Sequence, residues 1–214
     1  MIPNVPVRPL KEVWLRPRHV FRELAGTPVG LTDYVLAGAQ GIGNYLMYQS
    51  QSSDAHMSVA EIVVNSICFG PIAGIAGVFF FSLIYARLGA RAGGQSNRSQ
   101  MFHILAYGGL PMVATLLLWA VTFLLVGDAA FAAAPAIDTD GFVWFILHLQ
   151  FAAMLLLLFW SVVLQIMGFS EVLSLPVRKA FGLWFLGQLL GILAALFLAI
   201  VIAILLPNVG PSQP

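Results

Sequence analysis

Four stretches of the chain hold no Asp, Glu, Lys or Arg, and each is long enough to cross the hydrocarbon core of a bilayer. They cover residues 62–86, 101–126, 142–169 and 181–206. A transmembrane helix needs about 20 consecutive apolar residues. The chain as a whole is 60% hydrophobic and 9% charged, whereas soluble domains carry roughly 25% charged residues. We therefore predict an all-α, polytopic membrane protein whose surroundings are mainly lipid.

A fifth, more polar stretch, residues 31–48, is predicted to be the first and weakest span. It contains Asp33 near its start, followed by Gln40 and Asn44, and it is rich in Gly and Ala. A segment this polar inserts only marginally by itself. Its small residues allow close approach to other helices, so we expect it to be held by packing against them.

The positions of the basic residues predict the orientation of these five spans. Of the ten Lys and Arg, five lie in residues 1–30, three in residues 87–98 and two at positions 178 and 179. Basic loops stay in the cytosol, so the N-terminus is expected inside and the C-terminus outside. A four-span arrangement would put the first two basic segments on opposite sides. We predict a basic cytosolic segment (1–30), a five-span bundle (31–206) and a short tail (207–214), in a bacterial inner membrane.

The basic N-terminal segment is predicted to form a short interfacial helix that is retained, since it has no continuous apolar core of a signal peptide. Pro17 suits the first turn of a helix, and Val20, Phe21 and Leu24 then share one face. Trp14 precedes them. Two interpretations stay open: a site for anionic lipids or a partner, and a plain positive-inside anchor.

Two prolines lie inside predicted spans, Pro71 in residues 62–86 and Pro111 in residues 101–126. Proline removes a helical hydrogen bond and is expected to kink or break a helix. Both positions lie about 20 Å from the cytosolic surface at ~1.5 Å per residue. A pair of breaks at one depth is also a feature of transporters, although prolines often only shape packing.

The last span contains small residues at every fourth position: Gly187, Gly191, Ala195, Ala199 and Ala203. Such a stripe lets helix backbones approach closely. We predict that it is the main helix–helix contact surface. Its partner is either in the same chain or in a second copy.

No pattern of residues predicts catalysis, a cofactor or a metal site. The histidines lack metal-ligand spacing, and no nucleophile or phosphate-binding motif occurs. His148, with Gln150, is the best candidate for a polar contact inside the membrane, and an interhelical hydrogen bond is favoured over a proton relay. Gly93 and Gly94 suit either a phosphate cradle or a flexible turn. An intramembrane enzyme would need His148 beside Ser161, yet they lie about 20 Å apart along one helix.

Several short motifs together resemble the Yip domain family of five-span membrane proteins, the Ypt/Rab-interacting-protein type, and in particular its bacterial members. They are Trp14-Leu15-Arg16-Pro17-Arg18 with Phe21 and Leu24, Phe69-Gly70-Pro71, Gly93-Gly94 with Ser96 and Arg98, and Ala106-Tyr107-Gly108-Gly109-Leu110-Pro111. The resemblance extends from about residue 10 to residue 205. It implies five helices and a cytosolic N-terminus. Eukaryotic relatives bind small GTPases through a long cytosolic N-terminal region. The corresponding segment here has about thirty residues, so that role is not expected to transfer.

These observations lead to two hypotheses for the function. The first is a non-enzymatic protein that organises the bilayer, binds anionic lipids at its basic end, or recruits a membrane-protein partner or a second copy; no nucleic-acid partner is expected. The alternative is a small transporter or channel subunit with a hydrated cavity near Pro71 and Pro111. That cavity is predicted to be lined by Asn44, Asn65 and His148.

Overall fold

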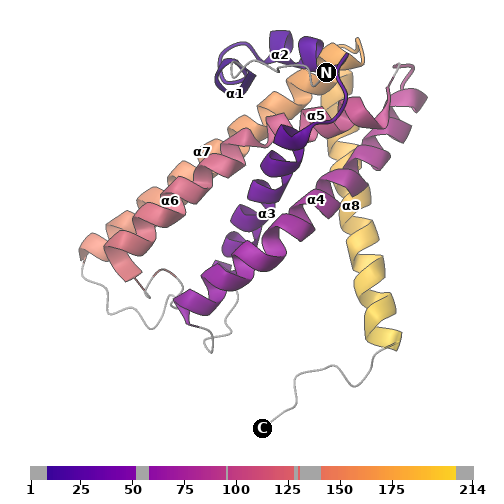
Figure 1. The fold of residues 1–214 in the computed structure, drawn as a ribbon. Coiled ribbons are helices and arrows are strands. Elements are labelled where there is room, and N and C mark those ends of the chain that lie inside the picture. The colour runs from indigo at the N-terminus through magenta and orange to yellow at the C-terminus, as the bar shows by residue number, and fades with distance from the viewer. Residues whose placement is uncertain (1–8, 52–57, 95, 128–129, 131–140, 206–214) are drawn as a thin grey trace.

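The computed structural model describes residues 9–51, 58–94, 96–127, 130 and 141–205, and its regular elements are all helices. Two short helices, α1 (Pro9–Glu12) and α2 (Pro17–Leu24), lie across one end of a bundle (Figure 1). The bundle itself consists of α3 (Leu31–Gln51), α4 (Val59–Arg91), α5 (Arg98–Gly108), α6 (Leu110–Val126), α7 (Gly141–Val172) and α8 (Val177–Leu205). The all-α membrane architecture predicted from the sequence is confirmed.

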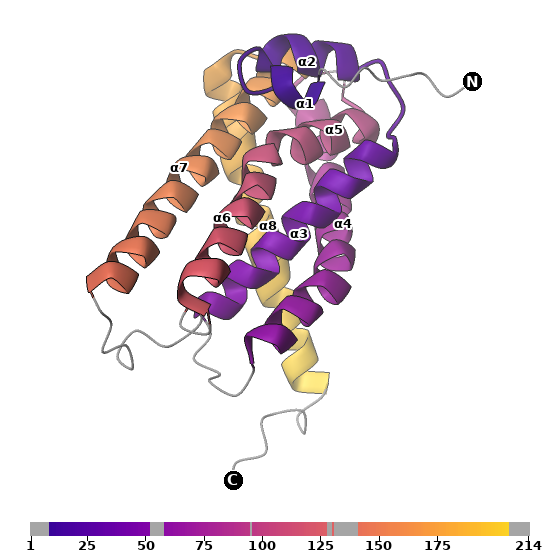
Figure 2. The same cartoon turned by 60° about the vertical axis from the view of Figure 1, so that its left-hand side comes forward.

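Four segments have the length and hydropathy of a membrane span: Val59–Arg91, Arg98–Val126, Trp144–Val172 and Val177–Leu198. The third predicted span is thus built from α5 and α6 together. Helix α3 is not among the four, although its 21 residues measure about 31 Å at 1.5 Å per residue. It runs between α4 and α6 along the bundle (Figure 2). Its polar side chains therefore enter the bundle through helix packing.

Pro111 interrupts its span, whereas Pro71 does not. Helix α5 ends at Gly108 and α6 begins at Leu110, with Pro111 in the first turn of α6. Helix α4 continues through Pro71 over 33 residues, so the predicted break at Pro71 is wrong. Neighbouring helices stabilise a proline-containing helix in a membrane. Here the ring of Pro71 packs where Gly38 of α3 has no side chain.

Helices α3 and α4 form the most extensive contact in the bundle because glycines bring their backbones together. A Cβ atom at Gly70 would lie 2.7 Å from the Cα of Ile42, and one at Gly74 would lie 2.7 Å from the Cα of Gly41. A Cβ at Gly41 would in turn meet the carbonyl oxygen of Gly70. The polar first span is therefore held against the second by direct backbone contact, as its small residues predicted.

The long helices contact one another in a cyclic order: α3 with α4, α4 with α8, α8 with α7, α7 with α6, and α6 with α3. Helix α5 also contacts α3, α4 and α7. Its residues Met101–Gly108 are all buried. The ring is thus filled with side chains at the end where α5 lies.

Helix α2 covers this filled end of the bundle. Its residues Val20, Phe21 and Leu24 are buried, and Phe21 reaches Gly168 of α7, where a Cβ would lie 3.1 Å from its ring. The sequence predicted that this apolar face would enter the lipid interface. It packs on α5 and α7 instead, because the ends of those helices offer a protein surface that is already apolar.

Candidate functional site

The break between α5 and α6 exposes backbone carbonyl groups that a continuous helix would pair. Gly109 N donates to Leu105 O over 3.0 Å, which closes the last turn of α5. Gln40 Nε2 of α3 donates to Ala106 O (2.8 Å), and Ser161 Oγ of α7 donates to Gly108 O (2.9 Å). Unpaired carbonyls in a membrane are costly. Side chains from the first and fourth spans therefore stabilise the break in the third.

Two glycines make room for these side chains. The amide of Gln40 lies against Gly109, where any Cβ atom would collide with it. A Cβ at Gly108 would lie 2.7 Å from Cγ of Gln165. The diglycine before Pro111 thus serves a close approach rather than only backbone freedom.

Further hydrogen bonds extend from this break to the second and fifth spans. Gln165 Nε2 lies 3.4 Å from Ser161 Oγ, and Trp184 Nε1 donates to Gln165 Oε1 (3.0 Å). Tyr85 OH donates to Trp184 O (3.0 Å), and Gln188 Nε2 donates to Tyr85 OH (3.2 Å). We call these side chains the polar belt: Gln40, Tyr85, Ser161, Gln165, Trp184 and Gln188. Together with the α5 carbonyls, it joins helices α3, α4, α5, α7 and α8.

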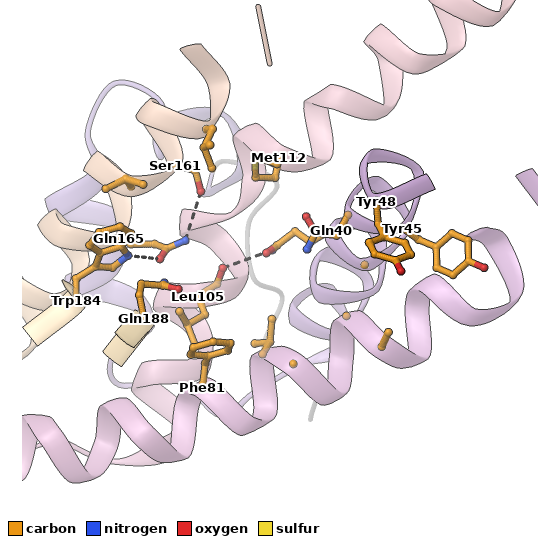
Figure 3. A pocket seen from close by; sticks show the side chains of 18 residues that line it. Gln40, Tyr45, Tyr48, Phe81, Leu105, Met112, Ser161, Gln165, Trp184 and Gln188 are labelled. Carbon is orange, nitrogen blue, oxygen red and sulfur yellow. Dashed lines mark hydrogen bonds between the residues drawn. The ribbon is translucent and has the colours of Figure 1, made fainter. Parts of the chain in front are cut away.

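A cavity of ≈ 720 Å³ lies beside the polar belt (Figure 3). All belt residues except Tyr85 line it, and Asn44, Tyr45 and Tyr48 of α3 contribute further polar groups. The rest of its wall is apolar or glycine. No Asp, Glu, Lys, Arg or His side chain is among the described residues that line it.

Of the three residues predicted to line a cavity, only one does so in the structure. Asn44 lines the cavity, but Asn65 and His148 do not. His148 is exposed on α7, stacks on Trp144 with ring centroids 3.9 Å apart and lies 2.8 Å from Trp144 O through Nδ1. The interhelical hydrogen bond expected of His148 is made instead by its neighbour Gln150, whose Oε1 accepts from Thr122 Oγ1 (2.6 Å).

Tyr107 and Pro111 lie in packed surroundings, whereas Gly93 is exposed. Tyr107 is 2% exposed and Pro111 is buried at the start of α6, and neither lines the cavity. Gly93 has φ +88°, and Gly94 N donates to Gly89 O (3.0 Å). This is the arrangement in which a glycine ends a helix, so the geometry of the Gly93-Gly94 pair is that of a turn.

The small-residue stripe of α8 packs over only part of its length. Tyr85 lies where Gly187 has no side chain, and Phe81 lies where Gly191 has none. Ala195 is exposed, and the side chain of Ala199 lies outside the described residues. Within the chain, the closest helix contact is therefore between α3 and α4 and not at the α8 stripe. A contact of the stripe with a second copy stays a prediction.

At the N-terminal end, Pro17 occupies the first turn of α2, as predicted. Arg16 and Arg18 are exposed and Trp14 is half-buried. Arg22 binds Glu171 of α7, with Nε 2.7 Å from Oε1.

One buried pair was not foreseen. Asp33 and His103 are 3% and 2% exposed, and Asp33 Oδ1 lies 2.6 Å from His103 Nδ1. The second carboxylate oxygen accepts from Gly30 N (2.9 Å). His103 Nε2 lies 3.1 Å from Thr27 O, and because a carbonyl only accepts, Nε2 carries a proton.

The pair connects the start of α3, the middle of α5 and the segment that follows α2. The Asp33–His103 pair could have been inferred from the predicted topology, because residues 33 and 103 each lie near the predicted cytosolic end of a span. Two complementary polar groups at one depth were therefore available to each other.

Among the described residues, the polar belt and the cavity beside it contain no recognisable catalytic group. Ser161 is buried and donates to a backbone carbonyl, whereas His148 is exposed on the same helix. Within the described residues, no group of three or more His, Cys, Asp or Glu side chains is placed to hold a metal ion. The polar atoms near the helix break can hold a ligand by hydrogen bonds, but they offer no nucleophile beside a base.

The family model described as the Yip1 domain matches residues 11–206. No curated protein and no solved structure matches the chain.

Proposed function

The chain belongs to the Yip1 domain family, and on this premise we propose that it is a non-enzymatic membrane protein that binds anionic lipid and organises the bilayer or recruits a partner at one end of its bundle. The observation that carries the proposal is the gathering of basic side chains at that end, the top of Figure 1. All the described ones are exposed: Lys11, Arg16, Arg18, Arg22, Arg87, Arg91, Arg98, Arg178 and Lys179.

A basic surface at one end of a membrane bundle is attracted to the anionic inner leaflet. Each Lys or Arg near that surface contributes about 1 kcal/mol. We place this end in the cytosol and the C-terminus outside, in a bacterial inner membrane, because basic segments stay inside.

The packing of α2 on the bundle supports a binding role for its arginines over a role as a plain positive-inside anchor. Its apolar face is already used for packing on α5 and α7, and Arg22 is tied to Glu171. Arg16 and Arg18 therefore project from a fixed platform. Leu15, 87% exposed between them and Trp14, is placed to enter the lipid interface beside these charges.

Replacing Arg16 and Arg18 is expected to reduce the amount of anionic lipid that the protein binds. For Arg16→Ala with Arg18→Ala, we expect phosphatidylglycerol that copurifies per protein to fall by about tenfold or more, because two cationic contacts of about 1 kcal/mol each are lost. Quantitative lipid mass spectrometry after purification from membranes measures it. Arg16→Lys with Arg18→Lys keeps the charge and should retain the lipid. Equal lipid in all three proteins would contradict the proposal.

The alternative, a small transporter or channel subunit, has one observation in its favour: the ≈ 720 Å³ cavity beside a broken third span. Broken helices form the sites of many transporters. This function requires the cavity to fill with water. In a Cys68→Ala background, Asn44→Cys would then react with a membrane-impermeant thiol reagent in intact vesicles. Protection of Asn44→Cys would exclude a hydrated pathway.

A further inference from the structure

Two amide oxygens of the polar belt are left without a hydrogen-bond partner among the described residues. Gln40 faces the carbonyl of Ala106, which only accepts, so its amide nitrogen points there. Tyr85 gives its hydroxyl proton to Trp184 O and therefore accepts from Gln188 Nε2. The chemistry of the partners thus fixes both amides. The Oε1 atoms of Gln40 and Gln188 remain as acceptors.

Both of these glutamines line the cavity (Figure 3). An unpaired polar group inside a membrane protein costs free energy unless a donor reaches it. A ligand that carries a hydroxyl or amide N–H would supply that donor. The two oxygens therefore point to a ligand with at least one donor group.

The remaining wall determines what else the ligand must be. Val78, Phe81, Met112, Leu158 and Val162 present hydrocarbon to the cavity. No charged side chain among the described residues lines it, so an ion would lose its hydration without a counter-charge. The ligand is therefore neutral and largely apolar. A volume of ≈ 720 Å³ lies within the roughly 300–1,000 Å³ of ordinary ligand sites.

The cavity lies at a depth where lipid has access to it. Helix α5 runs from Arg98 to Gly108, about 15 Å at 1.5 Å per residue, which is half of a ~30 Å hydrocarbon core. Four of the residues that line it are exposed: Asn44 and Tyr48 of α3, Ala73 of α4 and Leu158 of α7. Ala73 and Leu158 lie in the middle of their helices. Helix α8 has exposed side chains on most of its length beyond Gly191. On the side of Ala73 and Leu158, the rim is therefore apolar and open to acyl chains.

We propose that this cavity binds a neutral lipid with a free hydroxyl group, the chemistry shared by diacylglycerols and long-chain alcohols. The lipid enters sideways from the bilayer. Its hydroxyl donates to Oε1 of Gln188 or Gln40, and its chain lies along Phe81, Val78 and Leu158. This inference does not depend on the basic end of the bundle, so it stands or falls separately from the function proposed above.

Two glycines provide a matched pair of variants for the test. A Cβ atom at either Gly77 or Gly182 would meet nothing within 4 Å. Gly77 lines the cavity and Gly182 does not. Gly77→Leu therefore adds a side chain to the cavity wall and takes up part of its volume, whereas Gly182→Leu adds the same side chain at an exposed position of α8. Both replacements improve helix propensity alike, so a difference between them reports on the cavity.

The probe is a dioleoylglycerol with a diazirine in one chain, photolysed with the protein in nanodiscs of phosphatidylcholine. We expect wild type and Gly182→Leu to be labelled equally, with peptides of α4 and α7 carrying the label. Labelling of Gly77→Leu should fall about fivefold or more, the loss expected when a partly filled site forfeits ~1 kcal/mol of contacts. Equal labelling of all three proteins would overturn the proposal.

Competition experiments distinguish the two lipid sources and test the hydroxyl. Unlabelled dioleoylglycerol and oleyl alcohol are compared, and the stronger competitor identifies the class. Dioleoylglycerol should compete about fivefold better than its acetate ester, since a hydrogen bond is worth about 1 kcal/mol. Gln188→Leu should reduce this preference while labelling persists. An acetate that competes as well as the alcohol, or reaction of Asn44→Cys with an aqueous reagent, would refute a hydroxyl lipid as the occupant.

Discussion

Gly74→Ala is expected to lower the free energy of unfolding by about 3 kcal/mol, an unusually large loss for the addition of one methyl group. The new Cβ would meet the carbonyl oxygen of Ala37 and would lie 2.7 Å from the Cα and N of Gly41. These are backbone atoms, which cannot rotate away as a side chain can. Overpacking of this kind costs ~1–3 kcal/mol, and a clash between backbones belongs at the upper limit.

The same substitution three residues later is the control. A Cβ at Gly77 meets nothing within 4 Å, so Gly77→Ala should be neutral or stabilising by up to ~1 kcal/mol. Thermal unfolding in detergent, followed by size-exclusion fluorescence, measures both. At ~2–4 °C per kcal/mol for a chain of this size, Gly74→Ala should lower the Tm by about 6–12 °C. Equal Tm values would show that α3 and α4 do not pack through their backbones.

His103→Leu is the second change with a large expected effect. It leaves the carboxylate of Asp33, 3% exposed, without its closest partner. Removing one member of a buried pair costs ~3–5 kcal/mol, whereas replacing both members by apolar residues is often nearly neutral. We therefore expect the double variant Asp33→Leu with His103→Leu to be more stable than either single variant. The three proteins and wild type form a double-mutant cycle, measured by the same unfolding assay.

An exposed pair of the same chemistry serves as the control for this cycle. His19 Nε2 lies 3.5 Å from Glu23 Oε1 on α2, with side chains 57% and 61% exposed. Because water screens exposed ion pairs, His19→Leu should change stability by less than ~1 kcal/mol. Additive losses in the Asp33 and His103 cycle would mean that the two side chains act independently, contrary to their 2.6 Å contact.

The two prolines show where sequence reasoning succeeded and where it did not. Both remove a helical hydrogen bond, yet only the span of Pro111 is broken. Pro111 follows Gly108 and Gly109, and their lack of side chains admits Gln165 and Gln40. The donors that compensate the break come from α3 and α7, which are 66 and 53 residues away in sequence. No sequence pattern near Pro111 indicates that Gln40 and Ser161 would supply these donors.

The glycine stripes show a similar limit. The spacing of Gly187 and Gly191 correctly indicated close packing, but the same pattern continues through Ala195, which is exposed. A four-residue repeat says that a helix face is narrow. It does not say how far a neighbouring helix follows that face, because this depends on the crossing angle of the two helices.

The class of the protein could be predicted from the sequence, because a stretch of about 25 uncharged residues is stable in lipid only as a helix that pairs its own backbone groups. The sequence also predicted which loops share a side, since basic charge acts on each loop separately. The tertiary structure alone decided the polar belt, the cavity and the Asp33–His103 pair. Each of these depends on side chains from different spans meeting at one depth, and that depends on how far each helix slides and turns against its neighbours. For a single helix in lipid, sliding and rotation cost little free energy. Its depth and rotation are therefore fixed only when it packs against the other helices.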